Sequence, residues 1–351
     1  MAAIPTTTRQ WTLREKPTGL PELAGAHATF ELGTAELPPL QPSQVLLKTI
    51  YLSNDPAQRG WISGQRDPKR LYVPPVGLGE PMRALGIAEV IQSTADTLPV
   101  GTTVLTPTNW TQYSVHDAKD CQVVQPVPGL RVTHFLGSLG VPGLTAYVGL
   151  TEIAKVTKDD TVVVSGAAGA TGSMAVQIAK KLIGCKRVIG IAGTEEKCRW
   201  VESLGADLCL NYKTDSFEKD LAQATEDYVE VFYDNVGGRI LDLMLQRVKK
   251  FGRVAACGNI SNYNSELNPR PLKNFSEVIS NRINIQGFVV LDYLHKTAEV
   301  RDLFIQAWKE GKLVIDDSTE TVVPTSFEGI PSTWMKLFDG SNTGKLTTEL
   351  I

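Results

Sequence analysis

Cysteine is scarce in this chain of 351 residues, and the few cysteines are scattered. They stand at positions 121, 185, 198, 209 and 257, and no C-x-x-C motif occurs. An odd and dispersed set does not form a disulfide framework. We therefore expect isolated, reduced thiols.

Long apolar runs are also missing. No stretch of eighteen apolar residues occurs, and the first eleven residues lack a basic patch followed by an apolar core. These absences exclude a membrane-spanning helix and argue against a secretory signal. We expect a cytoplasmic protein with no membrane partner.

Neither sign of charge dominates the chain. Lys and Arg number 35 against 38 Asp and Glu, which gives a formal net charge of −3. Such a balance provides no field that attracts a polyanion, so nucleic acid is excluded as a partner. With 42% apolar and 21% charged residues, the composition is that of a globular protein. The length is about twice that of one domain, which predicts two domains and favours an enzyme over a small module.

The composition and the pattern of apolar residues change near residue 137. Residues 1–136 are rich in Pro, Gly and Thr and contain short alternating runs such as 45–50, which predicts a mostly β domain. Apolar strands then alternate with helical patterns, as in a doubly wound parallel sheet. Six strands are predicted, at 161–165, 187–192, 207–210, 229–233, 252–257 and 283–290.

Helical patterns separate these strands. Met174, Ile178 and Leu182 recur at i+4 and predict a crossover helix after the first strand. Further helices are predicted at about 195–204, 238–250 and 298–310. The last forty residues resemble short β pieces and turns, for example 340–344, and we expect them to rejoin the first domain. The predicted organisation is 1–136, 137–310 and a returning tail, 311–351.

A glycine-rich turn follows the first predicted strand of the second domain. Ser165 is followed by Gly-Ala-Ala-Gly-Ala-Thr-Gly, ending at Gly172, and then by the predicted helix. Small residues let a backbone approach a pyrophosphate, whose charge is met by free amides at the helix start. A tight turn made only for packing has a similar sequence, so the pattern alone is weak.

The end of the second predicted strand favours NADPH over NADH. NAD enzymes place an acidic residue there, whereas this strand ends in Ala192-Gly193. Glu195 and Glu196 follow, but with Thr194 as N-cap they fit the first turn of a helix. A small strand end leaves room for a 2′-phosphate, and Lys197 can supply a charge-assisted contact to it.

Together these motifs and others along the chain resemble one known family. The residues that carry the resemblance are Leu52-Ser-Asn-Asp-Pro56, Val141-Pro-Gly-Leu-Thr-Ala-Tyr147, Ala167-Ala-Gly-Ala-Thr-Gly172, Glu195-Glu-Lys-Cys198, Asn211-Tyr-Lys213, Asp234-Asn-Val-Gly-Gly238, Phe251-Gly-Arg253, Cys257-Gly-Asn-Ile-Ser-Asn-Tyr-Asn264, Phe288-Val-Val290 and Asn342-Thr-Gly-Lys345. The chain resembles the zinc-independent medium-chain dehydrogenase/reductases of the leukotriene hydroxydehydrogenase, prostaglandin reductase and alkenal double-bond reductase group.

The resemblance implies an α/β fold, with a GroES-like β domain beside a doubly wound Rossmann domain. It also implies NADPH as cofactor and a homodimer. The residues that it assigns to the cofactor are Ala168, Gly169, Ala170, Thr171, Gly172, Lys197, Tyr212, Asn235, Cys257, Gly258, Ile260, Tyr263, Phe288, Val289, Val290 and Asn342. Among them, Lys197 and Tyr212 are implied to contact the 2′-phosphate, and Asn342 to close over the cofactor from the tail.

No metal site is expected. The zinc enzymes of the wider superfamily hold zinc through Cys and His, but the segment matching their Gly-His-Glu motif reads Leu85-Gly-Ile-Ala-Glu89. The four histidines, at 27, 116, 134 and 295, show no ligand spacing. Without a Lewis acid, the easier reaction is conjugate hydride addition, because the oxygen of an enone accepts the developing charge.

Two tyrosines are the candidate catalytic residues. Tyr263 resembles the active-site tyrosine of the family, and its hydroxyl is predicted to steady the enolate; the alternative is ribose binding only. Tyr51 is predicted to line the substrate pocket, although a core or interface role is equally consistent with its position. Many relatives carry Tyr-Met-Arg after Asp55-Pro56, whereas this chain has Ala-Gln-Arg, so eicosanoid substrates are not transferred to it. Arg59 is expected to pair with Asp55 and hold this loop.

The sequence thus predicts NADPH-dependent reduction of the C=C bond of a small-molecule enone or alkenal. A quinone or carbonyl reductase on the same scaffold is the alternative within enzymes. An NADPH-binding protein with idle catalytic machinery is the alternative from another class.

Overall fold

The computed structural model describes residues 4–265, 267 and 271–351. Two compact units are present. The first comprises residues 1–136, 321–341 and 346–351, and the second comprises 137–320 and 342–345. Residues 311–320 therefore lie in the second unit, where the amide of Gln177 bonds the backbone of Val314 in both directions.

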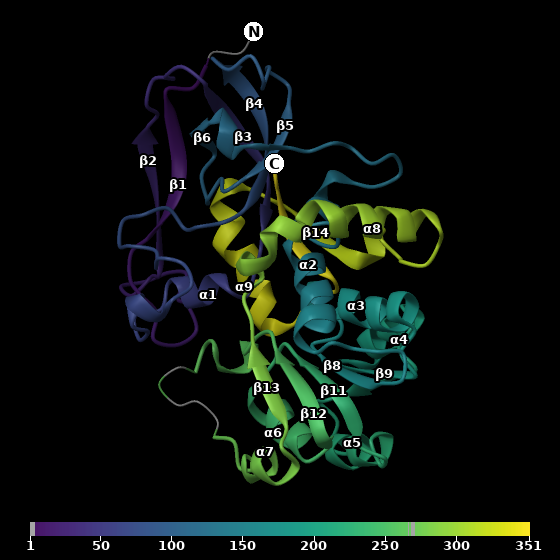
Figure 1. Cartoon of the computed structure of the whole chain (residues 1–351). Helices are drawn as coiled ribbons and strands as arrows, with labels where there is room; N and C mark the ends of the chain where they lie inside the picture. Colours follow the sequence, from purple (N-terminus) through teal and green to yellow (C-terminus); the bar gives the residue numbers. More distant parts are fainter. Residues whose placement is uncertain (1–3, 266, 268–270) are drawn as a thin grey trace. The chain divides into compact units, whose positions relative to one another are not determined.

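The second unit is built on a parallel sheet, which lies in the lower half of Figure 1. Within the described residues it has six strands, in the order β10-β9-β8-β11-β12-β13. Their bounds are β8 (Thr161–Ser165), β9 (Arg187–Ala192), β10 (Leu208–Asn211), β11 (Val229–Asp234), β12 (Val248–Ala256) and β13 (Asn284–Gly287). The first strand is central and the chain winds outward in both directions from it. The order therefore reverses between β8 and β11, where doubly wound sheets bind their ligands.

Helices connect these strands and cover the sheet. They are α2 (Val141–Val148), α3 (Ala170–Gln177), α4 (Glu195–Ser203), α5 (Phe217–Ala224), α6 (Gly238–Leu245), α7 (Ser276–Asn281) and α8 (Thr297–Lys309). Short π-helical turns extend α2 and α3, at Gly149–Ile153 and Ile178–Ile183. The central strands are buried on both faces, as in Val162, Val163 and Val164, because helices pack on each side of a parallel sheet.

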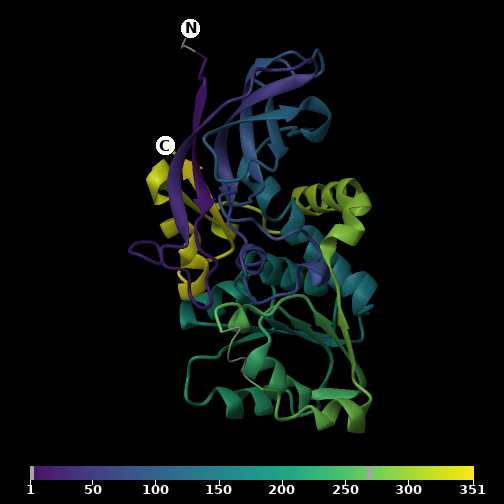
Figure 2. The same ribbon diagram turned by 90° about the vertical axis from the view of Figure 1, so that its left-hand side faces the viewer.

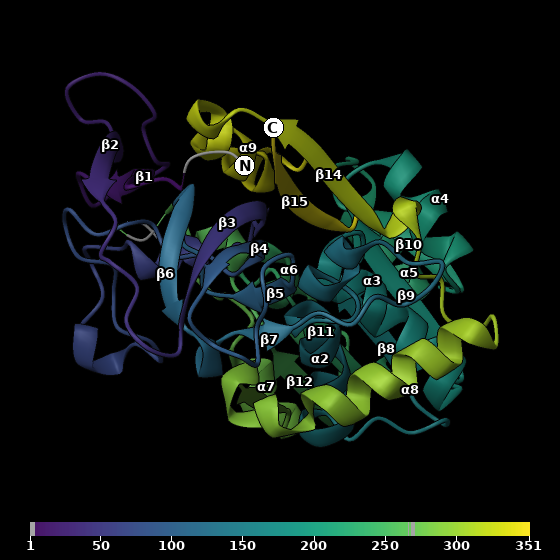
Figure 3. The same cartoon turned by 90° about the horizontal axis from the view of Figure 1, so that it is seen from above.

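The first unit is mostly β-structure. Its larger sheet has the order β14-β15-β3-β4-β5-β7, with β6 also paired to β3. The bounds are β3 (Gln44–Ser53), β4 (Gly86–Ser93), β5 (Thr103–Thr106), β6 (Tyr113–Asp117), β7 (Gln122–Val123), β14 (Glu320–Thr325) and β15 (Lys345–Leu350). The long strand β3 pairs with β6 along its first half and with β15 near its end, so the tail completes this sheet (Figure 3).

A separate ribbon and two helices complete the first unit. β1 (Thr7–Leu13) and β2 (Phe30–Glu36) form an antiparallel ribbon, drawn in purple in Figure 2. The helices are α1 (Gln58–Trp61) and α9 (Ile330–Asp339). Phe30, Trp110 and Trp334 pack together with ring centroids 4.9–5.8 Å apart and form the centre of an apolar core.

Several sequence-based expectations need correction. The helix predicted at 238–250 ends at Leu245, and β12 begins at Val248, because pairing with Val229 overrides the helical pattern. The sixth strand ends at Gly287 rather than at residue 290. The tail contains the helix α9, which the expected β pieces do not include; its Ile330 and Trp334 are buried, and Gly340 ends it in a left-handed conformation.

Within the part of the chain that the structure describes, no helix is both long and apolar enough to cross a membrane.

Candidate functional site

The glycine-rich turn joins β8 to α3 at the centre of the parallel sheet. Gly166 has a φ of +59°, a conformation that favours glycine. A Cβ on Gly172 lies only 2.2 Å from the carbonyl oxygen of Gly166, so the third glycine allows the helix to approach the turn. Gly169, the N-cap of α3, has no neighbour closer to such a Cβ than 3.3 Å. The turn therefore presents small residues in front of a helix start.

The helix α4, which begins shortly after the end of β9, is capped as the sequence predicts. The hydroxyl of Thr194 accepts a hydrogen bond from the backbone N–H of Lys197 at 3.2 Å, and Glu195 and Glu196 occupy the first turn of α4. The carboxylate of Glu195 accepts from the amide of Asn211 at 3.0 Å. The capping interpretation of the two glutamates is confirmed.

Tyr212 lies against the end of β9. Its backbone N–H donates to the carbonyl of Ala192 at 3.0 Å, and a Cβ on Gly193 is 3.1 Å from the Tyr212 ring. At the position where NAD enzymes have an acidic residue, this chain therefore has Gly193, which lies beside the ring of Tyr212. Tyr212 keeps 39% of its surface exposed, which leaves the ring accessible to a ligand.

Residues 342–345 of the tail belong to the second unit and contact this region. The N–H of Gly344 donates to the carbonyl of Ala168 at 2.9 Å, and Gly344 forms a β-bridge with Gly169. The ammonium of Lys197 donates to the carbonyl of Asn342 at 2.6 Å. The structure therefore brings together three predicted cofactor contacts that are far apart in sequence: the glycine turn, Lys197 and Asn342.

A second group of predicted residues gathers where β8 and β11 end. The amide of Asn235 donates to the carbonyl of Ser165 at 2.7 Å, and the Ser165 hydroxyl donates to the Asp234 carboxylate at 2.8 Å. The Asp234 carboxylate also accepts from the N–H groups of Val236 and Gly237. Burial raises the pKa of Asp234 above its ordinary value, and these hydrogen bonds oppose that rise.

The segment after β12 continues the same edge of the sheet. The N–H groups of Cys257 and Gly258 both donate to the carbonyl of Asp234, at 2.9 and 3.1 Å. A Cβ on Gly258 lies 2.8 Å from the Asn235 carbonyl, so the two backbones are in close contact. Ile260 then begins a short 3₁₀ turn, Ile260–Asn262, that leads to Tyr263.

Tyr263 is half-buried at the end of this turn. Its hydroxyl oxygen accepts a hydrogen bond from the N–H of Asn259 at 3.3 Å. This hydrogen bond directs the Tyr263 ring back toward Asn259, so the backbone of the same segment orients the phenol.

Phe288, Val289 and Val290 follow β13 and are half-buried. The Phe288 ring meets the ring of Tyr233 edge-on, with centroids 6.5 Å apart. Tyr233 is fully buried, and its hydroxyl donates to the carbonyl of Thr145 in α2 at 2.9 Å.

The analysis of the sequence missed Tyr233 and Ser165. Ser165 is the last residue of β8, and Tyr233 is the last but one of β11, so both lie near the carboxyl ends of neighbouring strands. A search for polar residues at strand ends finds them, because that edge is the one that binds ligands in open α/β sheets.

Cys257 has a protected thiol in this neighbourhood. Burial raises the pKa of the thiol to about 12, the hydrogen bond with Tyr233 lowers it, and the charge of Asp234 raises it further. The other four cysteines are buried, and all five thiols are free. The expectation of unpaired thiols is confirmed, but the thiols of Cys198 and Cys209 contact each other and are not isolated.

Tyr51 lies in the first unit, on β3. Its hydroxyl donates to the carboxylate of Glu349 on β15 at 3.2 Å. Burial raises the pKa of Tyr51 above its ordinary value, the carboxylate of Glu349 raises it further, and Arg131 opposes both effects. Tyr51 is thus held in a charged side-chain cluster of its own unit.

The loop after β3 is held by buried polar groups. The Asp55 carboxylate accepts from the hydroxyl of Ser53 at 2.6 Å. The guanidinium of Arg59 is fully buried and donates to the carbonyls of Pro17 and Gly19, at 3.1 and 2.8 Å. Arg59 therefore also fixes a second loop of the first unit, which its sequence position does not indicate.

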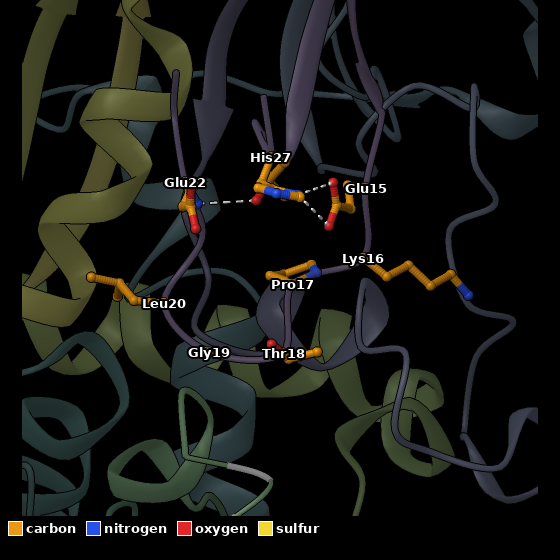
Figure 4. A pocket seen from close by; sticks show the side chains of 9 residues that line it. Glu15, Lys16, Pro17, Thr18, Gly19, Leu20, Glu22 and His27 are labelled. Atoms are coloured by element: carbon orange, nitrogen blue, oxygen red, sulfur yellow. Dashed lines mark hydrogen bonds and ion pairs between the residues drawn. The ribbon is translucent and has the colours of Figure 1, made fainter. Parts of the chain in front are cut away.

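A hollow in the first unit lies beside that second loop, between Glu15 and Thr29 (Figure 4). His27 points toward Glu15, with its Nδ1 3.2 Å from the carboxylate, and Lys16 points away. None of the predicted site residues lines this hollow.

Comparison with known proteins gives matches over nearly the whole chain. Residues 9–124 match a family described as the N-terminal domain of oxidoreductase, and residues 170–306 match one described as zinc-binding dehydrogenase. Prostaglandin reductase 1 of Bos taurus is 38% identical, over 96% of this chain and 97% of its own length. The 2-alkenal reductase (NADP(+)-dependent) of Nicotiana tabacum is 35% identical over 86% of each chain.

Among solved structures, CurA from Vibrio vulnificus in complex with NADPH matches with a TM-score of 0.87. It is 33% identical, and the match covers 98% of this chain and 99% of that one.

Proposed function

We propose that the substrates are α,β-unsaturated aldehydes and ketones, because the chain belongs to the prostaglandin reductase and alkenal reductase group of medium-chain dehydrogenase/reductases. It is an NADPH-dependent oxidoreductase that acts on C=C bonds. The reaction we propose is conjugate hydride addition without zinc.

The residues at the sheet edge fit a dinucleotide cofactor. Ala168, Gly169 and Ala170 present little side chain in front of α3, and a Cβ on Gly169 meets only one atom, at 3.3 Å. The first amides of a helix have no partner within that helix and attract a phosphate. These residues would hold the pyrophosphate.

The observation that carries the preference for NADPH is the pair of groups beside Gly193. Lys197 supplies a positive charge one turn into α4, and the accessible ring of Tyr212 lies over Gly193. No carboxylate ends β9, so a ribose 2′-hydroxyl has no carboxylate partner at the strand end. Lys197 and Tyr212 would hold the 2′-phosphate.

When bound, NADPH supplies the hydride that adds to the β-carbon of the substrate. We infer that the Tyr263 hydroxyl donates a hydrogen bond to the substrate oxygen, where negative charge develops. The N–H of Asn259 donates to the same hydroxyl, which orients it and strengthens it as a donor. In this proposal Tyr263 serves as a hydrogen-bond donor rather than as a base. The α-carbon then takes a proton from solvent or from a side chain.

Tyr51 is proposed to line the substrate pocket, and Glu349 holds its hydroxyl. The small Ala57 stands where many relatives carry tyrosine, so we infer a different range of alkenes from that of eicosanoid reductases.

The absence of zinc from the reaction is part of the proposal. The segment that matches the Gly-His-Glu motif of zinc enzymes lies at the start of β4, and its Ile87 and Ala88 are fully buried apolar residues. Neither side chain can ligate a metal. Purified enzyme should keep its turnover after dialysis against a chelator; loss of turnover that is restored by zinc would refute this part.

The test of function is NADPH consumption, with NADH in parallel, against short alkenals, alkyl enones, aryl enones and quinones, with products identified by mass. Saturated carbonyl products and a strong NADPH preference are expected. Alcohols or hydroquinones as main products would favour the carbonyl or quinone reductase alternative. Tight NADPH binding without turnover on any substrate would favour an idle cofactor-binding protein.

A further inference from the structure

The segment Asn342–Lys345, which we name the tail clasp, is the feature from which a further inference is drawn. The residues on either side of it, 321–341 and 346–351, belong to the first unit, while the clasp itself belongs to the second. After residue 320, only these four described residues of the tail are part of the Rossmann unit.

The clasp connects the two elements proposed to hold the cofactor phosphates. At one end, the N–H of Gly344 donates to Ala168, and Gly344 bridges Gly169 directly before α3. At the other end, the carbonyl of Asn342 accepts from the ammonium of Lys197 at 2.6 Å. The side-chain amide of Asn342 donates to the carbonyl of Gly344 at 3.0 Å and closes the clasp on itself.

A carbonyl oxygen orients a lysine without neutralising it. Lysine has a flexible four-carbon stem, and holding its ammonium at one point costs side-chain entropy when a ligand binds. The carbonyl of Asn342, 2.6 Å away, already restrains the ammonium before the ligand binds, so less side-chain entropy is lost on binding. A neutral acceptor also leaves the positive charge of the lysine unchanged. A pre-oriented charge binds an anion more tightly than a mobile one.

The backbone of Gly344 makes this arrangement possible. Its φ is +63°, and a Cβ on it lies 2.0 Å from the carbonyl oxygen of Thr319 and 2.4 Å from its carbonyl carbon. Both are backbone atoms, so no rotamer change can relieve the contact. Any side chain at position 344 must displace the clasp.

We propose that the tail clasp determines the selectivity of this enzyme for NADPH over NADH, with Asn342 and Gly344 as positioning residues for Lys197. This inference rests on the proposed function, since it assigns Lys197 to the 2′-phosphate. It adds that selectivity depends on backbone contacts of a tail segment distant in sequence from the strand end that usually sets it.

The decisive variant is Gly344→Ala, with Gly340→Ala as matched control. Gly340 lies in the same tail and also has positive φ, +73°, but a Cβ on it meets nothing within 4 Å. Both variants place alanine at a positive φ, and only one displaces the clasp. The dissociation constants of NADPH and NADH are measured for each by fluorescence titration.

We expect Gly344→Ala to raise the dissociation constant of NADPH about tenfold or more beyond its effect on that of NADH, the range for a charge-assisted contact, because the contact of the clasp with the glycine turn affects both cofactors. Gly340→Ala should change both constants equally. Lys197→Met should abolish the preference, and adding Gly344→Ala to it should cause little further loss, because both act on the same contact. An unchanged NADPH:NADH ratio in Gly344→Ala would overturn the proposal.

Hydrogen exchange of the wild-type enzyme decides the matter if Gly344→Ala does not fold. The peptide that contains residues 342–346 should exchange more slowly with saturating NADPH than with saturating NADH, and equal protection by both would refute the role of the clasp. Failure of the proposed function has a different outcome. In that case the wild-type enzyme itself shows no NADPH preference or no alkene reduction, and Lys197→Met has no effect.

Discussion

The three glycines of the β8–α3 turn should tolerate alanine very differently, and Gly172 should tolerate it least. A Cβ at 172 lies 2.2 Å from the carbonyl oxygen of Gly166, 2.8 Å from Cα of Ala167 and 2.8 Å from the carbonyl carbon of Gly166. An ordinary carbon–oxygen contact is about 3.5 Å, so the start of α3 must move by about 1 Å or more. All three atoms are backbone, and the turn cannot yield without disturbing β8.

Two effects oppose each other in Gly172→Ala. Alanine stabilises a helix by about 1 kcal/mol relative to glycine, whereas overpacking of this kind costs about 1–3 kcal/mol and often more when backbone must move. We expect a net loss of about 1–2 kcal/mol, which lowers the melting temperature by roughly 2–8 °C for a domain of this size. A shift of about 1 Å in the phosphate-binding turn should also lower kcat/KM for NADPH by at least about tenfold.

Gly169→Ala should separate the two roles. Its φ is −88°, and its Cβ is 3.3 Å from the carbonyl oxygen of Gly166, a tight contact that a small shift relieves. The melting temperature should therefore fall much less than in Gly172→Ala, by less than about 2 °C, while NADPH binding weakens because the Cβ stands before the helix start. Gly33→Ala on β2, whose Cβ meets nothing within 4 Å, is the control and should alter neither property. Thermal melting and NADPH titration of the three variants test this. Gly172→Ala with the stability of the wild-type enzyme would refute the argument that this glycine exists for packing.

Three further predictions follow from the site. Tyr263→Phe should lower kcat by about 10–100-fold with little change in NADPH affinity, as measured by steady-state kinetics and titration; normal turnover would leave it a ribose contact only. Cys257, with a thiol pKa of about 12, should react with iodoacetamide at pH 8 at least about a hundredfold more slowly in the native than in the denatured chain. In the native chain the rate should rise about tenfold for each added pH unit. Equal rates for the native and denatured chains in peptide mapping would contradict a protected thiol. The exposed edge strand β13 should pair two copies into a homodimer, and light scattering that gives the mass of one chain would disprove it.

Local sequence was sufficient where the pattern and the packing agree. The bounds of β8 and β9 are the predicted ones, because an apolar run between polar residues can only be a buried strand when helices flank it. The N-cap at Thr194 is likewise a local event, in which one hydroxyl meets an amide three residues away. The resemblance to the family rests on such local motifs.

Elsewhere the tertiary structure overrode the local pattern. The residues around Val248 continue a helical periodicity, yet pairing with β11 draws them into β12. The helix α9 was not predicted, because its apolar face is short and is stabilised by packing against the aromatic core that contains Trp334. Arg59 similarly has its carbonyl partners about forty residues earlier in the chain.

The fold class, the glycine turn and the small end of β9 follow from the amino-acid sequence alone, since each depends on neighbours within a few residues. The contacts of Asn342 with Lys197, across 145 positions, and of Gly344 with Ala168 are apparent only in the folded chain. The edge-on contact between the rings of Tyr233 and Phe288 is another such contact. Contacts of this kind join segments whose separation is large, and no periodicity or spacing encodes them. They arise because folding brings the ends of parallel strands to one edge and returns the tail of the chain to it.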